Sequence, residues 1–190
     1  QFHRVLCLGI CVAFVFIVLF SVSFAQLGTP TTESIYGGRI NAISVIALAS
    51  RGSMLNLSDA FYMLKLAVGP EAASVIDIRE PITENLKRIA AAKHKSISEL
   101  TVVMIDRPRH DKFADEIRAA GARIKFIQDG DVAGSIMAAR PGTGIDLLYG
   151  IGGTPEGVIS ACAMRCLGGE IQGKLAPQSD GEREQATGSH

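Results

Sequence analysis

The sequence lacks an excess of charge of either sign, and this absence limits the partners that can be expected. Lysine and arginine together number 19, and aspartate and glutamate together also number 19. No overall electrostatic field therefore draws the chain to nucleic acid or to an acidic membrane surface. No nucleic acid partner is expected, and any bound anion must be held by a local group of residues.

Cysteine is scarce, and its spacing does not favour a metal or redox site. The four cysteines form two pairs with a spacing of four residues, without a CxxC motif or a neighbouring histidine cluster: Cys7, Cys11, Cys162 and Cys166. Structural zinc sites and thiol redox centres typically use CxxC pairs or cysteine and histidine clusters. Reduced cysteines that contribute to packing are the favoured interpretation.

Two nucleotide-binding motifs are also missing. The sequence contains no GxxxxGK[ST] loop, and no GxGxxG motif followed by an acidic residue at the required distance. This argues against a nucleotide ligand. What the sequence does contain is 190 residues, 47% of them hydrophobic and 20% charged, which is sufficient for one globular domain with a core.

The N-terminal segment differs from the rest of the chain. Residues 5–24 carry no charge and are about as long as a bilayer span. A secretory signal and a membrane anchor both fit, as does a foreign segment joined to a fragment, and membrane association is expected only if the segment is genuine. The expected organisation is a hydrophobic segment at 1–25, a linker at 26–40, a domain at 41–178 and a polar tail at 179–190.

Alternating apolar and amphipathic segments place the domain in the α/β class. Strands are expected at 42–49, 61–68, 100–106, 122–127 and 145–149, and helices at 81–94, 110–120, 131–139 and 155–167. The alternation of strand and helix after residue 100 is typical of parallel βαβ units, whose ligands bind at the carboxyl ends of the strands. The loops that follow Asp106, Ile127 and Tyr149 are therefore the candidate ligand-binding segments.

Each of these loops has polar chemistry that suits a ligand, and each also has a plainer interpretation. DRPRH at 106–110 offers two guanidinium groups for phosphate oxygens, but a solvated basic loop fits as well. Asp129-Gly130-Asp131 offers carboxylates for sugar hydroxyls or a cation, or forms a turn that caps the next helix. GIGGTPEG at 150–157 lets a ligand approach the backbone next to helix amides that favour an anion.

Glu156 is an unexpected residue beside an anion site. Its carboxylate can complement the dipole of the helix that it begins. A divalent metal ion that bridges Glu156 to a phosphate group accounts for it equally well. Together with the arginines and the aspartate pair, this glutamate favours a phosphorylated and hydroxylated ligand.

The three loops, in this order and spacing, closely resemble those of class II fructose-1,6-bisphosphatases, the bacterial type that includes bifunctional sedoheptulose-1,7-bisphosphatases. The resemblance extends to FYMLKLAVGP at 61–70 and LGGEIQGKL at 167–175. It implies a layered α/β sugar-phosphatase sandwich with a largely parallel sheet, whose N-terminal half is missing. It further implies a cytoplasmic homo-oligomer that uses Mn²⁺ or Mg²⁺ to hydrolyse the 1-phosphate of fructose 1,6-bisphosphate to fructose 6-phosphate in gluconeogenesis.

The resemblance also assigns roles to individual residues. Glu156 would be a metal ligand, and the sugar bisphosphate would contact Tyr62, Arg107, Pro108, Arg109, Asp129, Gly130, Asp131 and Gly153. Most of the family's other metal carboxylates lie in the missing half, and the register of the family's D-P-x-[DE]-G-T motif falls on GTPTTE at 28–33, where its acids are absent. Because one glutamate cannot hold two divalent ions, this chain alone is expected to have little or no phosphatase activity.

Three interpretations of the chain remain open at this point. It is the C-terminal portion of a class II bisphosphatase, or a catalytically dead sugar-phosphate-binding module that is tethered to a membrane if its N-terminal segment is genuine. The third interpretation is a structural remnant whose incomplete core exposes apolar surface and aggregates. An inositol phosphatase is less favoured, because the three loops match the bisphosphatase pattern closely.

Overall fold

The computed structural model of the chain describes residues 40–41 and 62–179. The chain divides into two compact units, Gln1–Pro30 and Thr31–His190, and all the described residues belong to the second unit. The hydrophobic segment at 5–24 and the strand expected at 42–49 lie outside the described residues, so both stay predictions, as do the domain boundaries. Within residues 40–41 and 62–179, no helix has the length and apolar character needed to cross a membrane.

The elements of the described residues follow the sequence pattern closely. The strands are β1 (Ile40–Asn41), β2 (Tyr62–Val68), β3 (Thr101–Ile105), β4 (Arg123–Ile127), β5 (Leu147–Gly153) and β6 (Glu170–Leu175). The α-helices are α4 (Ile82–Ala92), α5 (Asp111–Ala119), α6 (Asp131–Ala139) and α7 (Thr154–Leu167), and short 3-10 helices are η1 (Pro70–Ala72), η2 (Ile97–Glu99) and η3 (Pro108–His110). Each helix and strand expected after residue 61 is present, whereas β6 was not expected and β5 is longer than predicted.

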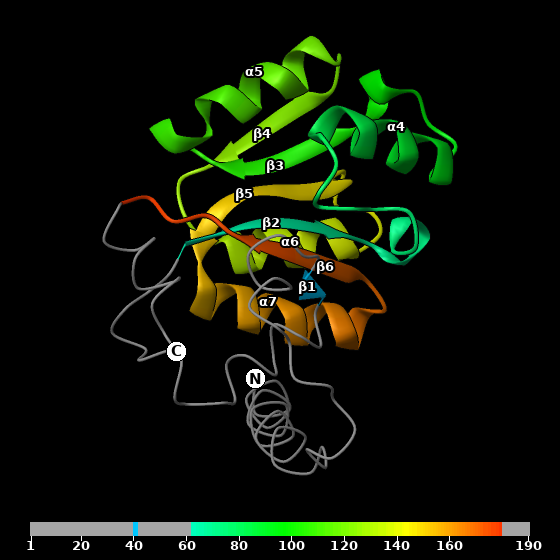
Figure 1. Ribbon diagram of the computed structural model, residues 1–190. Coiled ribbons are helices and arrows are strands. Elements are labelled where there is room, and N and C mark those ends of the chain that lie inside the picture. Colours follow the sequence, from blue (N-terminus) through cyan, green and yellow to red (C-terminus); the bar gives the residue numbers. More distant parts are fainter. Residues whose placement is uncertain (1–39, 42–61, 180–190) are drawn as a thin grey trace. The chain divides into compact units, whose positions relative to one another are not determined.

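The strands form one mixed sheet in the order β1-β6-β2-β5-β3-β4 (Figure 1). β3 pairs in parallel with β4 and β5, as the alternation with α5 and α6 predicts. β2 pairs antiparallel with both β5 and β6, and β1 pairs antiparallel with β6. The α/β class is confirmed, but the sheet is parallel only across β4, β3 and β5. β5 and β6, which α7 connects in the chain, run in the same direction. β2 lies between them in the sheet and runs in the opposite direction, and no local sequence pattern predicts this pairing.

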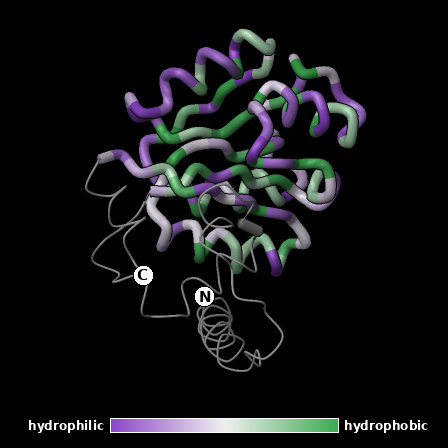
Figure 2. The backbone as a smooth tube through the Cα atoms, in the orientation of Figure 1, coloured by the Kyte–Doolittle hydropathy of each residue, from purple (hydrophilic) through white to green (hydrophobic). Residues whose placement is uncertain are grey.

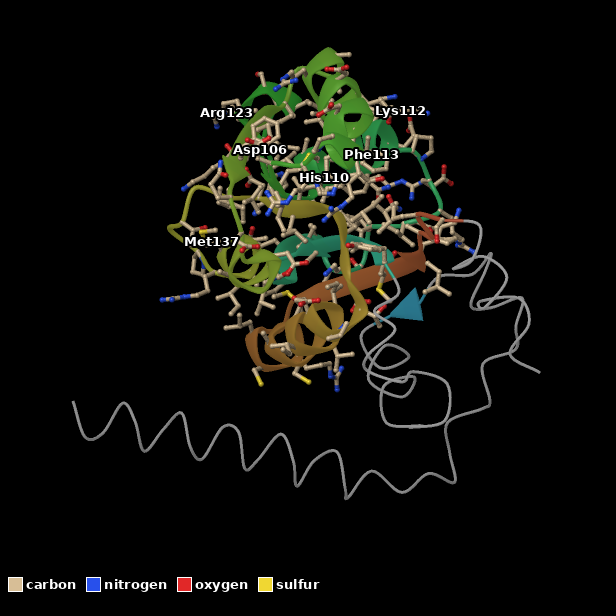
Figure 3. All side chains as sticks on the ribbon, turned by 90° about the vertical axis from the view of Figure 1, so that its left-hand side faces the viewer. Asp106, His110, Lys112, Phe113, Arg123 and Met137 are labelled. Carbon is tan, nitrogen blue, oxygen red and sulfur yellow. The ribbon has the colours of Figure 1, made fainter. Side chains whose placement is uncertain are left out.

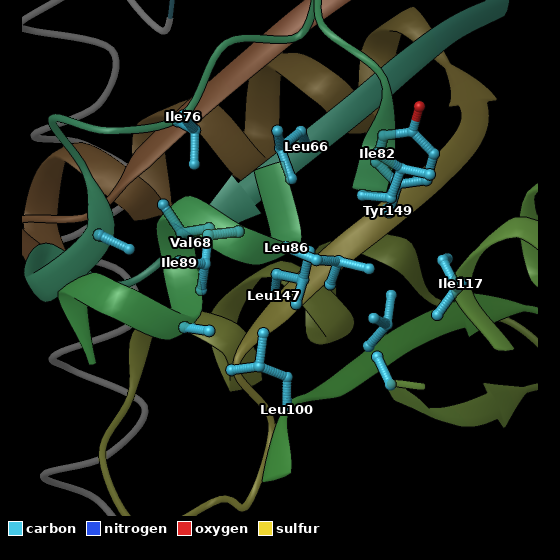
Figure 4. Packing of buried hydrophobic residues seen from close by; sticks show 14 of the residues in the cluster. Leu66, Val68, Ile76, Ile82, Leu86, Ile89, Leu100, Ile117, Leu147 and Tyr149 are labelled. Atoms are coloured by element: carbon cyan, nitrogen blue, oxygen red, sulfur yellow. The ribbon is translucent and has the colours of Figure 1, made fainter. Parts of the chain in front are cut away.

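Helices cover both faces of the sheet, with α4 and α5 on one face and α6 and α7 on the other (Figure 1). Figure 2 shows that hydrophobic positions are concentrated along the strands, while α5 presents many hydrophilic ones. Adjacent strand residues enter different cores: Leu66 and Leu147 pack with Leu86 beneath α4 (Figure 4), whereas Ala67 and Leu148 belong to the core on the α6 and α7 face. The central strands are therefore apolar at consecutive positions, because both of their faces are covered.

A buried carboxylate fixes the start of β5 to the end of α4. Asp146 Oδ1 accepts hydrogen bonds from Lys95 Nζ at 2.7 Å and lies 3.1 Å from Lys93 Nζ, and its Oδ2 accepts from the Thr101 amide at 2.9 Å. Burial by itself raises the pKa of Asp146, but the hydrogen bonds from Lys95, the Thr101 amide and Lys93 outweigh burial and hold this pKa below its ordinary value. This cluster lies at the amino end of β5, so it fixes the strand from the end opposite to the predicted site.

Candidate functional site

The ends of β2, β3, β4 and β5 that meet at one edge of the sheet carry or precede the predicted site residues. The carboxyl ends of β3, β4 and β5 lie there because the three strands are parallel. The amino end of β2 joins them, since Tyr62 is the antiparallel partner of Gly153. Figure 3 views the molecule from this side, and shows Asp106 and His110 at the end of β3. The prediction that the polar segments share one edge is confirmed, and β2 adds Tyr62 to them.

Arg109 is held in place by two contacts, and its terminal nitrogens stay available. Its Nε donates a hydrogen bond to the carbonyl oxygen of Ile151 at 3.1 Å. Its guanidinium carbon lies 5.1 Å from the centroid of the Tyr62 ring, which is a cation–π arrangement. Among the described residues, the two terminal nitrogens have no hydrogen-bond partner. Arg109 is therefore fixed at one end and can present a fork of donors to an anion.

Arg107 and Asp129 form the outer, solvated part of the site. Arg107 Nη1 donates to the Asp106 carbonyl at 2.7 Å, and Arg107 Nη2 lies 4.0 Å from Asp129 Oδ1. The Asp129 side chain is 93% exposed, so this ion pair is weak and open to exchange for a ligand. Pro108 is the first residue of η3, and Gly130 takes a left-handed φ of 88° just before α6. The two segments thus face each other through their charged side chains.

Asp131 differs from Asp129, because it is buried and paired with a lysine. Its carboxylate forms an ion pair with Lys65 of β2, which also donates to the Gly153 carbonyl at 3.1 Å. Asp131 does not cap α6 with its side chain, contrary to one sequence-based interpretation. The pairing of Lys65 was not predicted; a single lysine within an apolar strand indicates only that a buried charge needs some partner, not which residue supplies it.

His110 connects the end of β3 to β5 from a fully buried position. Ile151 donates its amide hydrogen to Nε2 of His110 at 2.8 Å, so the ring hydrogen is on Nδ1, which donates to the Ile105 carbonyl at 2.7 Å. The ring lies on Gly150, where a side chain would meet it at 3.3 Å. The sequence placed His110 in a basic loop. In the structure it connects β3 to β5, and this connection fixes Ile151, whose carbonyl accepts the hydrogen bond from Arg109.

The GIGGTPEG segment is not a loop, which corrects the sequence-based interpretation. β5 continues to Gly153 and α7 begins at Thr154, because the glycines keep pairing with β2. The Lys65 side chain lies against the backbone at Gly152, and a side chain at position 152 would meet Lys65 Nζ at 2.8 Å. Glycine is needed in this strand for close approach of a neighbouring side chain, and the strand passes directly into the helix.

Glu156 lies in the first turn of α7, and its exposed carboxylate is turned back over Gly153. A side chain at position 153 would occupy the space of the Glu156 carboxylate. Across residues 40–41 and 62–179, no group of three or more histidine, cysteine, aspartate or glutamate side chains is arranged to hold a metal ion. Glu156 alone therefore does not form the metal centre that the resemblance implies, and the described residues do not complete one.

The cysteines of α7 are reduced, as expected, and they differ in burial. Cys162 is half-buried and Cys166 is exposed, and both are free thiols. Burial, with a smaller effect of Cys166, raises the pKa of the Cys162 thiol. Cys7 and Cys11 lie outside the described residues.

The mixed sheet, with helices on both faces and its polar groups at one edge, is an α/β sandwich of the phosphatase type. Comparison with known proteins identifies the family. The model of the family described as bacterial fructose-1,6-bisphosphatase, glpX-encoded, matches residues 28–190, and the chain belongs to this family.

Curated relatives give the same assignment. The chain is 46% identical over 143 residues to the class 2 fructose-1,6-bisphosphatase of Haemophilus influenzae, covering 75% of this chain and 43% of that protein. It is also 46% identical over 143 residues to fructose-1,6-bisphosphatase 1 class 2 of Escherichia coli K12, covering 75% of this chain and 42% of the relative. The chain therefore spans less than half the length of the curated relatives that it matches.

Proposed function

We propose that the chain carries the substrate-binding portion of a class 2 fructose-1,6-bisphosphatase, and that the edge described above binds a sugar bisphosphate. The observation that carries this proposal is the anchoring of Arg109 between Tyr62 and the Ile151 carbonyl, which leaves its fork of donors without partners among the described residues. Such a pre-organised guanidinium suits a phosphate group.

The described residues divide the work of binding between phosphate and sugar. Arg107 and Arg109 bind phosphate oxygens, and the backbone at Gly153 approaches the ligand at the start of α7. Asp129 and Asp131 accept hydrogen bonds from sugar hydroxyls. These groups bind and orient the substrate of the whole enzyme, whose proposed reaction is hydrolysis of the 1-phosphate of fructose 1,6-bisphosphate to fructose 6-phosphate and phosphate.

The cofactor is also a proposal. The family resemblance implies Mn²⁺ or Mg²⁺, which would supply Lewis-acid chemistry at the phosphate, with Glu156 as one of its ligands. The other oxygen ligands are expected outside the described residues, because no metal-binding cluster occurs within them. The same observation supports a second candidate, a catalytically dead sugar-phosphate-binding module.

Calorimetry and a phosphatase assay test both candidates on the 190-residue chain. With fructose 1,6-bisphosphate and Mn²⁺ we expect little or no release of phosphate, and robust turnover would overturn this expectation. Without metal we expect weak binding if the chain is the portion of an enzyme, and tight binding if it is a dedicated binding module.

An arginine variant tests the site itself. Arg109→Ala should weaken fructose 1,6-bisphosphate binding by about thirtyfold, since hydrogen bonds to a charged group contribute about 2 kcal/mol. Arg140→Ala, which removes an exposed arginine that follows α6, should leave binding unchanged. Absence of binding by the unaltered chain, or equal affinities for the Arg109→Ala variant and the unaltered chain, would contradict the proposed function.

A further inference from the structure

Lys65 is the one charged side chain of β2, and it is 1% exposed. It lies in β2 between Leu64 and Leu66. Its contact with Asp131 of α6 and its position beside Gly157 of α7 place it on the side of the sheet that these two helices cover. Two site segments converge on its ammonium group: Asp131, the first residue of α6, and the carbonyl of Gly153, the last residue of β5, at 3.1 Å. Lys65 therefore connects β2, α6 and β5 from a buried position behind the candidate site.

Burial decides what Lys65 can do. An ammonium group loses its hydration when buried, and it is retained only where a charge partner and further acceptors replace the water. Asp131 supplies the charge partner and the Gly153 carbonyl supplies a further acceptor. The Lys65 ammonium group is therefore occupied by protein contacts, and it does not contact a ligand directly as Arg109 can. Lys65 can affect ligand binding only by positioning Asp131 and the Gly153 carbonyl.

Gly152 of β5 explains how this lysine is accommodated. A side chain at position 152 would overlap the Asp131 carboxylate and meet Lys65 Nζ at 2.8 Å. A side chain at Gly157 of α7 would contact Lys65 Cδ at 3.6 Å. Gly152 of the GIGGTPEG segment thus leaves space for the Lys65 and Asp131 pair, which links this segment to a lysine far earlier in the chain.

We propose that Lys65 is a positioning residue of the sugar-phosphate site: its buried ammonium orients Asp131 toward the sugar hydroxyls and fixes the Gly153 carbonyl at the start of α7. This inference rests on the proposed function. Carboxylate oxygens accept hydrogen bonds, and the contact with Lys65 selects one orientation of the Asp131 side chain. The second carboxylate oxygen then stays available to a hydroxyl group of the ligand.

A double-mutant cycle on the 190-residue chain tests the proposal, with fructose 1,6-bisphosphate affinity measured by calorimetry. Lys65→Met and Asp131→Asn should each weaken binding by about tenfold, and the double variant should lose about tenfold in total, because residues that act as a unit are not additive. Affinity for inorganic phosphate, which the arginines hold, should not change in Lys65→Met. The matched control Lys125→Met alters an exposed lysine of β4 and should bind as the unaltered chain does.

A further variant covers the case in which Lys65→Met does not fold, as judged by circular dichroism. Gly152→Ala keeps both charged groups and forces them apart, and it should lower sugar bisphosphate affinity by about tenfold while phosphate affinity is kept. An additive loss of about a hundredfold in the double variant, or equal losses for both ligands, would overturn the positioning role. If the unaltered chain does not bind fructose 1,6-bisphosphate, the proposed function itself fails, and this result is distinct from the others.

Discussion

The Arg109 guanidinium carbon lies 5.1 Å from the centroid of the Tyr62 ring, so that a residue following β3 stacks on the first residue of β2. These two strands are not neighbours in the sheet, because β5 lies between them. Arg109 crosses β5 to reach Tyr62 and donates to the Ile151 carbonyl of β5 on its way. The arrangement fixes the Arg109 side chain before a phosphate binds, so less side-chain conformational entropy is lost on binding.

Replacing the Tyr62 ring should weaken phosphate binding without abolishing it. Tyr62→Leu removes the cation–π contact, which contributes about 0.5–1 kcal/mol at an accessible site, so affinity should fall about two- to fivefold. Tyr62→Phe keeps the ring and should bind inorganic phosphate like the unaltered chain. Calorimetry with inorganic phosphate measures both, and a large loss in Tyr62→Phe would instead indicate that the hydroxyl contacts the ligand.

Removal of the His110 ring should destabilise the domain. In His110→Leu the Ile105 carbonyl and the Ile151 amide lose their partner, and two unsatisfied buried groups cost about 3 kcal/mol. Urea unfolding at pH 7 measures the free energy of unfolding. His94→Asn is the matched control, since His94 is exposed and its left-handed φ of 53° suits asparagine. Equal stability of the two variants would contradict the bridging role.

The stability supplied by Asp146 should depend on pH. Its pKa is lower in the folded chain than in the unfolded chain, so its contribution is complete above the unfolded value of about 3.9 and is lost as pH falls through the folded value. Asp146→Asn should therefore lower the free energy of unfolding by about 2 kcal/mol at pH 7. The difference from the unaltered chain should decrease when unfolding is measured at successively lower pH below 4.

An exposed aspartate provides the control for this measurement. Asp115 lies 3.4 Å from Arg118 in a surface ion pair, and its side chain is 80% exposed. Asp115→Asn should change the free energy of unfolding by less than about 0.5 kcal/mol at any pH. A constant difference between Asp146→Asn and the unaltered chain down to low pH would show that Lys93 and Lys95 do not depress the pKa of Asp146.

The charge of Glu156 should oppose anion binding when no metal is present. Its carboxylate lies over Gly153, and a like charge about 4 Å away in water costs about 1 kcal/mol. Glu156→Gln should therefore bind fructose 1,6-bisphosphate about fivefold more tightly in the presence of a chelator. Glu84→Gln alters a partly exposed glutamate of α4, on the sheet face opposite to α7 (Figure 1), and should have no effect. Unchanged or weaker metal-free binding by Glu156→Gln would contradict a repulsion between this carboxylate and the phosphate.

The two cysteines of α7 should differ in reactivity. Iodoacetamide at pH 8 should modify exposed Cys166 several times faster than Cys162, because burial raises the pKa of the Cys162 thiol and limits access to it. Peptide mapping by mass spectrometry separates these sites from Cys7 and Cys11. Faster modification of Cys162 would contradict its half-buried position.

Local patterns were sufficient for most of the elements. The bounds of α6 agree with the prediction at both ends, since Asp131 and Arg140 enclose a compact apolar segment. A strand at 61–68 was also predicted from its apolar run before Gly69 and Pro70, and β2 spans Tyr62–Val68. These features depend on residues that are close in sequence, where helix and strand periodicities act.

The features that the sequence did not predict depend on distant contacts. β6 contains glycine and glutamine and shows little strand character, but its Gln172 side chain accepts from the Ile78 amide at 2.9 Å and donates to the Ile76 carbonyl at 3.0 Å. Likewise, the partners of Lys65 come from β5 and α6, so that no local spacing could reveal them. The site residues could be named from the resemblance, but the lysine beneath them could not.

The position of β2 in the sheet also constrains the order in which the domain can form. β2 is the first long strand of the described residues, yet its partners are β5 and β6, which begin at Leu147 and Glu170. A growing chain can assemble β3, α5 and β4 early, whereas β2 cannot complete its pairing until β6 has left the ribosome. Pairings of such large sequence separation form slowly. The Tyr62 and Gly153 register, and with it the ligand edge, therefore forms only after β5 has been synthesised, far later than β2 itself.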